Sequence, residues 1–200
     1  MNLSEIKKDV AFAQRLMLLD GYDCGKVDGI WGKRTELAWQ NWLRDARSHK
    51  KSIGELDARS EGNLETLLPS CQKAIRTWFV DRVLPWAEKN CCVVKIICGT
   101  RSFREQDKLY QQGRLLPGAI VTKAKGGFSN HNFGIAYDLG LFVNGIYEEG
   151  DKLYRKLHAD CGCPDGFLWG GDWRSMPDTP HYQLARFGDT TEKIRKVFMH

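Results

Sequence analysis

The sequence predicts an α+β fold. Stretches with the helical spacing of apolar residues are mixed with short β-branched runs, and no strand-helix-strand unit repeats along the chain. The 200 residues are 42% apolar and 11% aromatic, which is enough for at least one good core. A chain of this length forms one domain or two small ones.

The amino-terminal part predicts three short helices. Apolar spacing indicates a first helix from Ile6 to Leu19, and a glycine-rich stretch with the turn pair Asp28-Gly29 follows it. A second helix is expected over Lys33 to Ala46, a polar surface loop over 47–60, and a third helix over Gly62 to Leu68, ended by Pro69. The sequence therefore predicts a three-helix domain over residues 1–68 and a second domain over 69–200.

The glycine-rich stretch does not fit a phosphate-binding loop. The first required glycine falls on Val27, and the residue after Gly32-Lys33 is Arg34 rather than Ser or Thr.

The second predicted domain mixes helices and strands. A long amphipathic helix is expected from Cys71 to Asn90, kinked or frayed near Pro85. The β-branched run Val93 to Cys98 predicts a buried strand. A helix over Phe103 to Gly113 and strands over Ile135 to Val143 and Tyr182 to Ala185 complete the expected elements.

Charge and cysteine content limit the function classes. The net charge of +5 is spread along the chain, and no nucleic-acid-binding signature accompanies it, so nucleic acid is not expected as a partner. The seven cysteines, without a signal peptide, predict reduced and mostly buried thiols. No apolar segment predicts a membrane span. We expect a cytosolic, monomeric protein.

Two histidines and a carboxylate predict a catalytic metal site. His131, Asp138 and His181 have the side chains of a zinc ligand set, and three protein ligands leave one position open for water. Asp178, three residues before His181, is the expected base, and Asp172 is its rival. Taken singly, Asp138 could instead pair with an arginine, and His131 could be a hydrogen-bonded surface residue.

Local geometry constrains these ligands. Seven residues separate His131 from Asp138, so on one uninterrupted strand they would face opposite sides. The chain must therefore turn between them, and Gly134 permits the turn. Pro180 excludes a regular helix between Asp178 and His181.

Val10 to Trp42 contain the landmarks G-Y, at Gly21-Tyr22, and D-G-x-x-G-x-x-T, from Asp28 to Thr35, while Met17 stands where a Q-x-x-L landmark from Gln14 would have leucine. With these landmarks the amino-terminal part resembles a peptidoglycan-binding domain. The resemblance implies a three-helix module that holds an enzyme on the cell wall. The alternative is that Asp28, Gly29, Gly32 and Thr35 only shape the turn and cap the second helix.

Four motifs follow one another between Cys71 and Ala185: Arg101-Ser102-Phe103 with Gln106, Leu109-Tyr110 and Gly113, then Ser129-x-His131-x-x-Gly134-x-Ala136-x-Asp138, then Trp169-Gly170-Gly171-Asp172-Trp173, and then Asp178-x-Pro180-His181. With these motifs this part resembles the D-alanyl-D-alanine carboxypeptidase and L-alanyl-D-glutamate endopeptidase family, most closely its phage endolysin and bacterial L-alanyl-D-glutamate members. The resemblance implies a zinc peptidase domain with a mostly antiparallel sheet flanked by helices.

Carried over by position, the resemblance implies that His131, Asp138 and His181 bind zinc and that Asp178 is the general base and acid. Arg101 would face the polarised carbonyl of the substrate. Ser129, Trp173 and Gln106 would lie near the substrate, although Ser129 could only cap its loop and Trp173 could only pack the core.

The expected function is that of a peptidoglycan hydrolase that cuts the stem peptide, between L-alanine and D-glutamate. A phage endolysin held in the host cytoplasm before lysis, and acting on the wall, fits the absence of a signal peptide. The alternatives are a D,D-carboxypeptidase that removes a terminal D-alanine and a zinc-containing wall-binding protein without catalysis.

Overall fold

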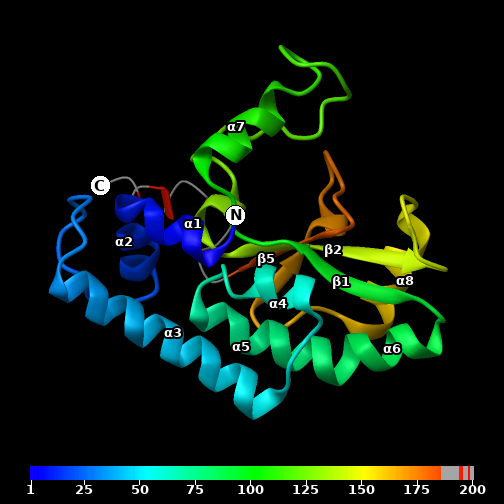
Figure 1. The fold of residues 1–200 in the computed structure, drawn as a ribbon. Helices are drawn as coiled ribbons and strands as arrows, with labels where there is room; N and C mark the ends of the chain where they lie inside the picture. Colours follow the sequence, from blue (N-terminus) through cyan, green and yellow to red (C-terminus); the bar gives the residue numbers. More distant parts are fainter. Residues whose placement is uncertain (186–193, 196–197, 199–200) are drawn as a thin grey trace.

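The centre of the molecule is an antiparallel sheet (Figure 1). The computed structural model describes residues 1–185, 194–195 and 198, and within them five strands pair in the order β1-β2-β5-β4, with β3 beside β2. The strands are β1 (Val93–Cys98), β2 (Ala136–Val143), β3 (Ile146–Tyr147), β4 (Phe167–Trp169) and β5 (His181–Leu184). The predicted α+β class and antiparallel sheet are confirmed.

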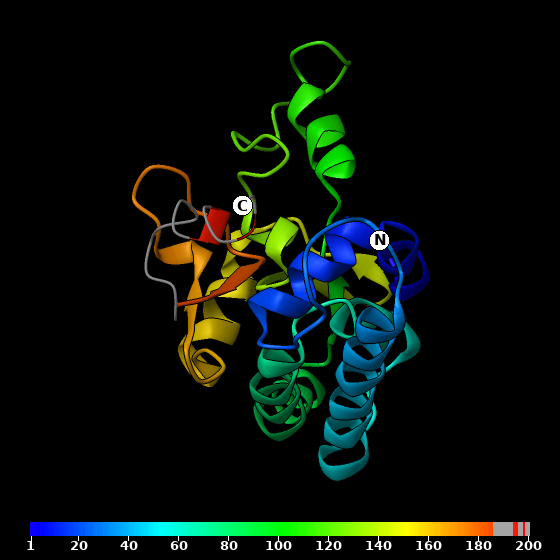
Figure 2. The same cartoon turned by 90° about the vertical axis from the view of Figure 1, so that its left-hand side faces the viewer.

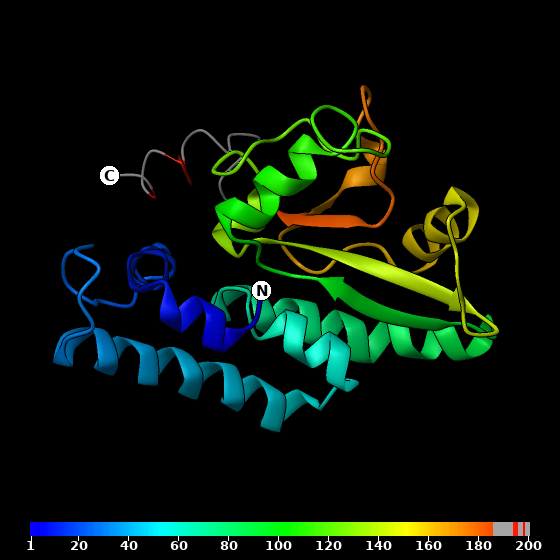
Figure 3. The same cartoon turned by 45° about the horizontal axis from the view of Figure 1, so that its top comes forward.

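Helices cover one face of this sheet (Figure 3). A continuous helical rod runs along it, and the Trp78 ring of this rod lies 5.3 Å from the Tyr182 ring of β5. The rod consists of α5 (Pro69–Trp78), a π-helical turn (Phe79–Val83) and α6 (Leu84–Lys89), and the other helices are α1 (Leu3–Lys8), α2 (Val10–Leu19), α3 (Lys33–Ile53), α4 (Ala58–Leu64), α7 (Phe103–Gln111) and α8 (Asp151–Cys161).

The two faces of β2 have different roles. Tyr137, Leu139 and Leu141 are fully buried and belong to the hydrophobic core that includes the rod. Because successive side chains of a strand point to opposite faces, Asp138 points away from this core. The face that lacks the helical rod therefore carries the polar residues of the sheet.

One glutamine organises the glycine-rich stretch of the amino-terminal part. The Gln14 side chain accepts hydrogen bonds from the backbone N–H groups of Asp28 and Gly29, at 3.1 and 2.9 Å, and donates to the Asp28 carboxylate at 2.9 Å. Gly32 is the N-cap of α3 and provides no side-chain cap. These contacts give the landmark residues a structural role, and the wall-binding role stays a prediction.

Residues on both sides of the predicted domain boundary share one core. Ser60 and Asn63 of α4 bond the backbone of Ile96 in β1: Ser60 Oγ accepts from its N–H at 3.0 Å, and Asn63 Nδ2 donates to its carbonyl at 2.8 Å. The buried apolar residues form a continuous cluster from Ile6 to the sheet. The division at residues 68 and 69 stays a prediction.

The structure corrects the predicted loop over residues 47–60. Helix α3 continues to Ile53 and α4 begins at Ala58, so most of this segment is helical and the third helix covers Ala58–Leu64 rather than Gly62 to Leu68. The segment was misassigned because it is polar. One side of α3 nevertheless packs on α5, and this tertiary contact stabilises a helix that composition alone does not indicate.

The irregular turn near Pro85 precedes the proline and is not the last turn of the helix, since α6 runs regularly from Leu84 to Lys89. Pro85 lacks the N–H that would bond the preceding turn, and the five residues before α6 form a π-helical turn. The predicted first helix is also divided, since Asp9 ends α1 and its side chain caps α2 by accepting from Phe12 N–H. Helix α8 and strands β3 and β4 were not predicted.

The cysteines are less buried than expected. Cys24, Cys71 and Cys161 are buried, Cys91 is exposed, and the others are half-buried. Within the described part of the chain, no helix has the length and hydropathy that a membrane crossing requires.

Candidate metal centre

The pairing of β2 with β5 places two predicted ligands beside each other. Asp138 and His181 are direct cross-strand partners in this antiparallel pair, so their side chains lie on the same face. That face is opposite the one formed by Tyr137 and Tyr182, which stack on each other in the core. The alternation of the two strands therefore directs both candidate ligands away from the helical rod.

A tight turn brings the third predicted ligand to the same point. His131 lies on a 3₁₀ turn (Asn130–Phe133), and Gly134 follows in the left-handed conformation with φ of 68°. The predicted turn at Gly134 is confirmed. The imidazole is almost fully buried, and its Nδ1 lies 2.8 Å from the Gly99 carbonyl oxygen. With a proton on Nδ1, His131 donates to this carbonyl, and its Nε2 lone pair is free to bind a metal.

Three donor atoms form a small triangle. His131 Nε2 lies 3.2 Å from Asp138 Oδ1, His181 Nδ1 lies 3.0 Å from the same oxygen, and the two nitrogens are 3.2 Å apart. Ligand atoms about 2.0–2.1 Å from a tetrahedral zinc ion are separated by about 3.3 Å. The triangle therefore fits one zinc ion with little movement.

A glutamine and an asparagine orient His181. His181 Nε2 lies 3.1 Å from Gln183 Oε1, and Asn130 Nδ2 donates to the same oxygen at 2.7 Å. With its proton on Nε2, His181 donates to Gln183, and its Nδ1 lone pair points to the triangle. Both imidazoles thus have an outer acceptor that favours the metal-binding tautomer.

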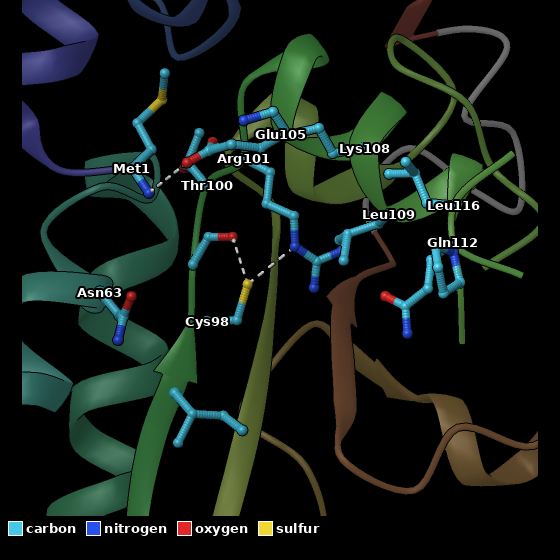
Figure 4. Close-up of a pocket in the computed structure, with 13 residues that line it drawn as sticks. Met1, Asn63, Cys98, Thr100, Arg101, Glu105, Lys108, Leu109, Gln112 and Leu116 are labelled. Atoms are coloured by element: carbon cyan, nitrogen blue, oxygen red, sulfur yellow. Dashed lines mark hydrogen bonds and ion pairs between the residues drawn. The ribbon is translucent and has the colours of Figure 1, made fainter. Parts of the chain in front are cut away.

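Arg101 holds the other oxygen of the ligand carboxylate. Its Nη2 donates to Asp138 Oδ2 at 2.7 Å, while its Nη1 donates to Gln106 Oε1 at 3.1 Å. Its Nε lies 3.1 Å from the Cys98 sulfur (Figure 4). The arginine pair, one of the two alternatives for Asp138 in the sequence, therefore leaves Oδ1 available and is compatible with a metal role for this carboxylate.

Cys98 is a rival ligand. Ligand atoms of Cys98, His131 and Asp138 lie within 4.8 Å of one another. However, the sulfur is 3.8 Å from His131 Nδ1, the nitrogen that faces the Gly99 carbonyl. The donor atoms of His131, Asp138 and His181 lie closer together, at 3.0–3.2 Å, and this set uses the free lone pairs of both imidazole rings. These three residues therefore form the better candidate metal site.

The charges at this centre favour a bound cation. Burial opposes ionisation of Asp138, but the two histidines hold the pKa of its carboxyl well below the usual range. Burial would also lower the pKa of His131, yet the Asp138 carboxylate raises it to about 10. In the ion-free protein a proton on His131 thus neutralises Asp138, and a divalent ion would replace that proton.

A glycine allows the Asp178 loop to lie against the ligands. Asp178 N–H donates to the Gly170 carbonyl at 3.0 Å, and a Cβ on Gly170 would lie 2.6 Å from the Asp178 carbonyl oxygen and 3.0 Å from His181 Cβ. Asp178 remains open to solvent. Partial burial and the nearby Asp138 charge raise the pKa of the Asp178 carboxyl.

The donor triangle opens into a cavity of about 520 Å³. Asp178, Ser129 and Trp173 line it, and the Trp173 ring lies 5.0 Å from the His181 ring. Gln106 is fully buried behind Arg101 and does not line the cavity, and neither does Asp172. The remaining lining residues are Arg101, Leu109, Val121, Thr122, Ala124, Phe128, Asn130, His131, Asp138, His181 and Gln183.

The structure thus brings together seven of the eight predicted site residues around one cavity and places Gln106 behind them. Their roles stay predictions. The sequence reasoning assigned no role to Gln183, Asn130, Cys98 or the Gly99 carbonyl. The sequence does carry a signal for Gln183. It lies two positions after His181, so on a strand its side chain is on the same face as the histidine.

Comparison with known proteins agrees with this arrangement. Residues 122–184 match the profile of a protein family described as D-alanyl-D-alanine carboxypeptidase. This segment contains His131, Asp138, Asp178 and His181. The profile match therefore agrees, over this part of the chain, with the resemblance found in the sequence motifs.

A curated relative has a related description. The peptidoglycan L-alanyl-D-glutamate endopeptidase CwlK of Bacillus subtilis (strain 168) is 39% identical over 107 residues, which are 49% of this chain and 64% of the relative. The chain thus spans less than two thirds of the length of that relative.

Two solved structures show weaker similarity. The Serratia marcescens L-Ala D-Glu endopeptidase ChiX is 24% identical with a TM-score of 0.45, covering 70% of this chain and 97% of that chain. The vancomycin resistance D,D-pentapeptidase VanY, in complex with Zn(II), is 18% identical with a TM-score of 0.40. The match covers 63% of this chain and 76% of that chain.

Proposed function

We propose that this protein is a zinc peptidase that cleaves the stem peptide of bacterial peptidoglycan at the L-alanyl-D-glutamate bond. The observation that carries the proposal is the triangle of His131, Asp138 and His181 donor atoms, 3.0–3.2 Å apart, at the wall of a solvent-open cavity. The likeness to CwlK supports the choice of substrate.

The donor set fits zinc. His131 and His181 would bind the ion through neutral imidazoles and Asp138 through Oδ1, while Arg101 and the outer acceptors hold these groups in place. When bound, zinc supplies a Lewis acid that makes a water molecule more acidic and polarises a peptide carbonyl.

Asp178 handles the protons of the reaction. Its carboxylate lines the cavity beside the ligands and accepts a proton from the attacking water. Because its pKa is raised, the carboxylic acid so formed is able to return the proton to the leaving amine. Arg101 contributes mainly by orienting Asp138, since its Nη2 is already engaged with that carboxylate.

The cavity favours an endopeptidase over a carboxypeptidase. A D,D-carboxypeptidase needs a cation to recognise the free carboxylate of its substrate. Among the described residues that line the cavity, Arg101 is the one Lys or Arg, and it is paired with Asp138. The described part of the lining offers no second Lys or Arg for a substrate terminus, and Arg195 lies next to it, 4.3 Å from the centre of the Phe128 ring.

Mass spectrometry of fragments released from purified peptidoglycan tests the proposal. We expect fragments with a new amino terminus on D-glutamate, abolished by a chelator and restored by zinc. Loss of a single D-alanine would instead identify a carboxypeptidase. If zinc-loaded protein bound the wall without releasing fragments, the alternative of a non-catalytic wall-binding protein would replace the proposal.

The biological role we propose is that of an endolysin whose amino-terminal helices, residues 1–68, contact the wall. Resemblance of residues Val10 to Trp42 to a peptidoglycan-binding domain supports this role. Expression inside a bacterium tests it: lysis is expected only when the cytoplasmic membrane is permeabilised. The full-length protein is the suitable reagent for such tests, because the amino-terminal helices share a core with the sheet.

A further inference from the structure

Helix α7 and the loop after it project away from the body of the molecule (Figures 1 and 2). We refer to residues 103–125 as the projecting lobe. A second cavity, of about 540 Å³, lies at the base of the lobe beside β1, with Lys108, Gln112 and Leu116 on its lobe side (Figure 4). The lobe therefore stands partly clear of the sheet.

The loop of the lobe is braced from within. Arg114 Nη2 donates to the Thr122 carbonyl at 3.1 Å, and its guanidinium lies 4.0 Å from the centre of the Tyr110 ring. Gly113 has a φ of +73°, and a Cβ there would lie 2.6 Å from the backbone nitrogen of Ile120. The two limbs of the loop thus lie against each other and hold the tip in a defined shape.

The tip exposes four large apolar side chains. Leu115 is 82% exposed, Leu116 47%, Ile120 52% and Val121 46%. Single exposed apolar residues are common on soluble proteins, but a group of four on one projecting loop indicates a contact surface.

The same lobe carries unopposed positive charge. Between Arg104 and Lys125 the chain has five basic and two acidic residues. Both acidic side chains have partners: Glu105 pairs with the amino terminus, and Asp107 accepts from Gly126 N–H at 2.8 Å. In contrast, none of the exposed cations Arg104, Lys108, Lys123 and Lys125 pairs with a carboxylate of the described residues.

We propose that the projecting lobe binds the surface of an anionic phospholipid bilayer. Its apolar tip would enter the boundary between headgroups and acyl chains, and its cations would pair with the lipid phosphates. The polar sugars and peptides of the cell wall would satisfy the cations but would leave Leu115 and Ile120 exposed to water. A bilayer accommodates both features of the lobe.

The lobe is connected to the cavity of the metal centre. Val121 belongs to the apolar tip and also lines that cavity, as does Leu109 of α7. A lobe docked on a bilayer would therefore keep the cavity next to the membrane surface. This inference is independent of the proposed peptidase function, because it concerns binding and not catalysis.

Cosedimentation of the full-length protein with lipid vesicles tests the inference. We expect binding to vesicles that contain phosphatidylglycerol, weak binding to pure phosphatidylcholine vesicles, and weaker binding at high salt. The double variant Leu115→Ser with Ile120→Ser should lower the partition coefficient about tenfold or more. Lys108→Gln with Lys123→Gln should lower it about tenfold on the anionic vesicles alone.

Matched variants provide the controls. Ile30→Ser with Leu37→Ser removes an equally exposed pair elsewhere, and Lys51→Gln with Lys152→Gln removes two other exposed charges. Both should bind vesicles as the original protein does, and circular dichroism should show that every variant is folded.

Equal binding by the lobe variants and their controls would overturn the inference. So would lobe variants that keep vesicle binding and lose binding to purified peptidoglycan, since the lobe would then contact the wall.

Discussion

At the scale of single residues, the sequence indicated the three candidate ligands but not the groups that orient them. His131, Asp138 and His181 stand out in the sequence because two imidazoles and a carboxylate are a zinc ligand set. The acceptors that orient the rings are a backbone carbonyl, at Gly99, and the Gln183 amide. Their roles depend on strand register and on a turn, neither of which a single sequence specifies.

The first residue-scale prediction concerns Asp178. The substitution Asp178→Asn removes the proposed base and should lower the rate of stem-peptide cleavage about a hundred- to ten-thousand-fold. The zinc content should not change, because Asp178 is not one of the three proposed ligands. Assays of released fragments and metal analysis on the same preparations test this, and the rival Asp172→Asn variant should keep its activity. Undiminished cleavage by Asp178→Asn would exclude it as the base.

The raised pKa of Asp178 predicts a pH dependence. The base acts when it is deprotonated, so cleavage should decline as the pH falls through the pKa of this carboxyl. In the ion-free protein, burial and the Asp138 charge raise the pKa of this carboxyl above the ordinary aspartate value of 3.8. A pH profile of the cleavage rate, with zinc content measured at every pH, separates protonation of Asp178 from metal loss. A decline that follows only the zinc content would contradict the assignment.

The second residue-scale prediction concerns the support of His181. Gln183→Leu removes the acceptor for His181 Nε2 and should weaken zinc affinity about 10- to 100-fold. Titration with a competing chelator measures this affinity without relying on activity. The exposed Gln40→Leu is the matched control and should bind zinc normally. Equal affinities in the two variants would show that Gln183 does not position the ligand.

At the scale of elements, the sequence predicted those strands whose residue pattern matches their burial in the structure. Strand β1 was recognised because its β-branched residues suit a buried strand, and β2 because its apolar run is long. The last part of α3 was missed because Arg47 to Lys51 are almost all polar. Strand β4 was missed because its three residues gain their structure from pairing with β5.

The junction between β4 and β5 provides an element-scale prediction. In Gly170→Ala, the added methyl group would meet the Asp178 carbonyl oxygen and His181 Cβ, so the loop must move away from the metal centre. Cleavage should fall about tenfold or more, since small displacements of catalytic groups are costly. Gly62→Ala is the control, because nothing lies within 4 Å of its added Cβ. If both variants cleaved normally in the fragment assay, the close packing of the loop would not matter for activity.

At the scale of the whole molecule, the predicted division at residues 68 and 69 crosses a buried ion pair. Arg76 of α5 is fully buried, and its guanidinium binds both oxygens of Glu61 at 2.5 and 2.8 Å. Sequence analysis indicated two units because each resembles a separate module. It could not indicate the contacts between them, since those depend on the packing of α4 and α5.

This pair predicts the behaviour of a shortened chain. Residues 69–200 alone would lose the Glu61 partner of Arg76 and the helices α3 and α4 that pack on α5 and β1, so part of the core would be exposed to water. The shortened chain should therefore unfold at much lower denaturant concentration than the full chain, or aggregate. In the full chain, Glu61→Gln leaves the buried Arg76 without a charged partner and should lower the free energy of unfolding by about 3–5 kcal/mol. Urea titrations measure both, and a shortened chain as stable as the full one would establish separable domains.

The hydrogen bonds from α4 to β1 have a further consequence. Strand β1 is the border of the sheet, and a border strand with bare backbone groups can recruit a strand from another molecule and start fibrous aggregation. Ser60 and Asn63 occupy both backbone groups of Ile96, and the body of α4 covers the same side. The helix thereby keeps copies of this protein from joining edge to edge when they accumulate at high concentration.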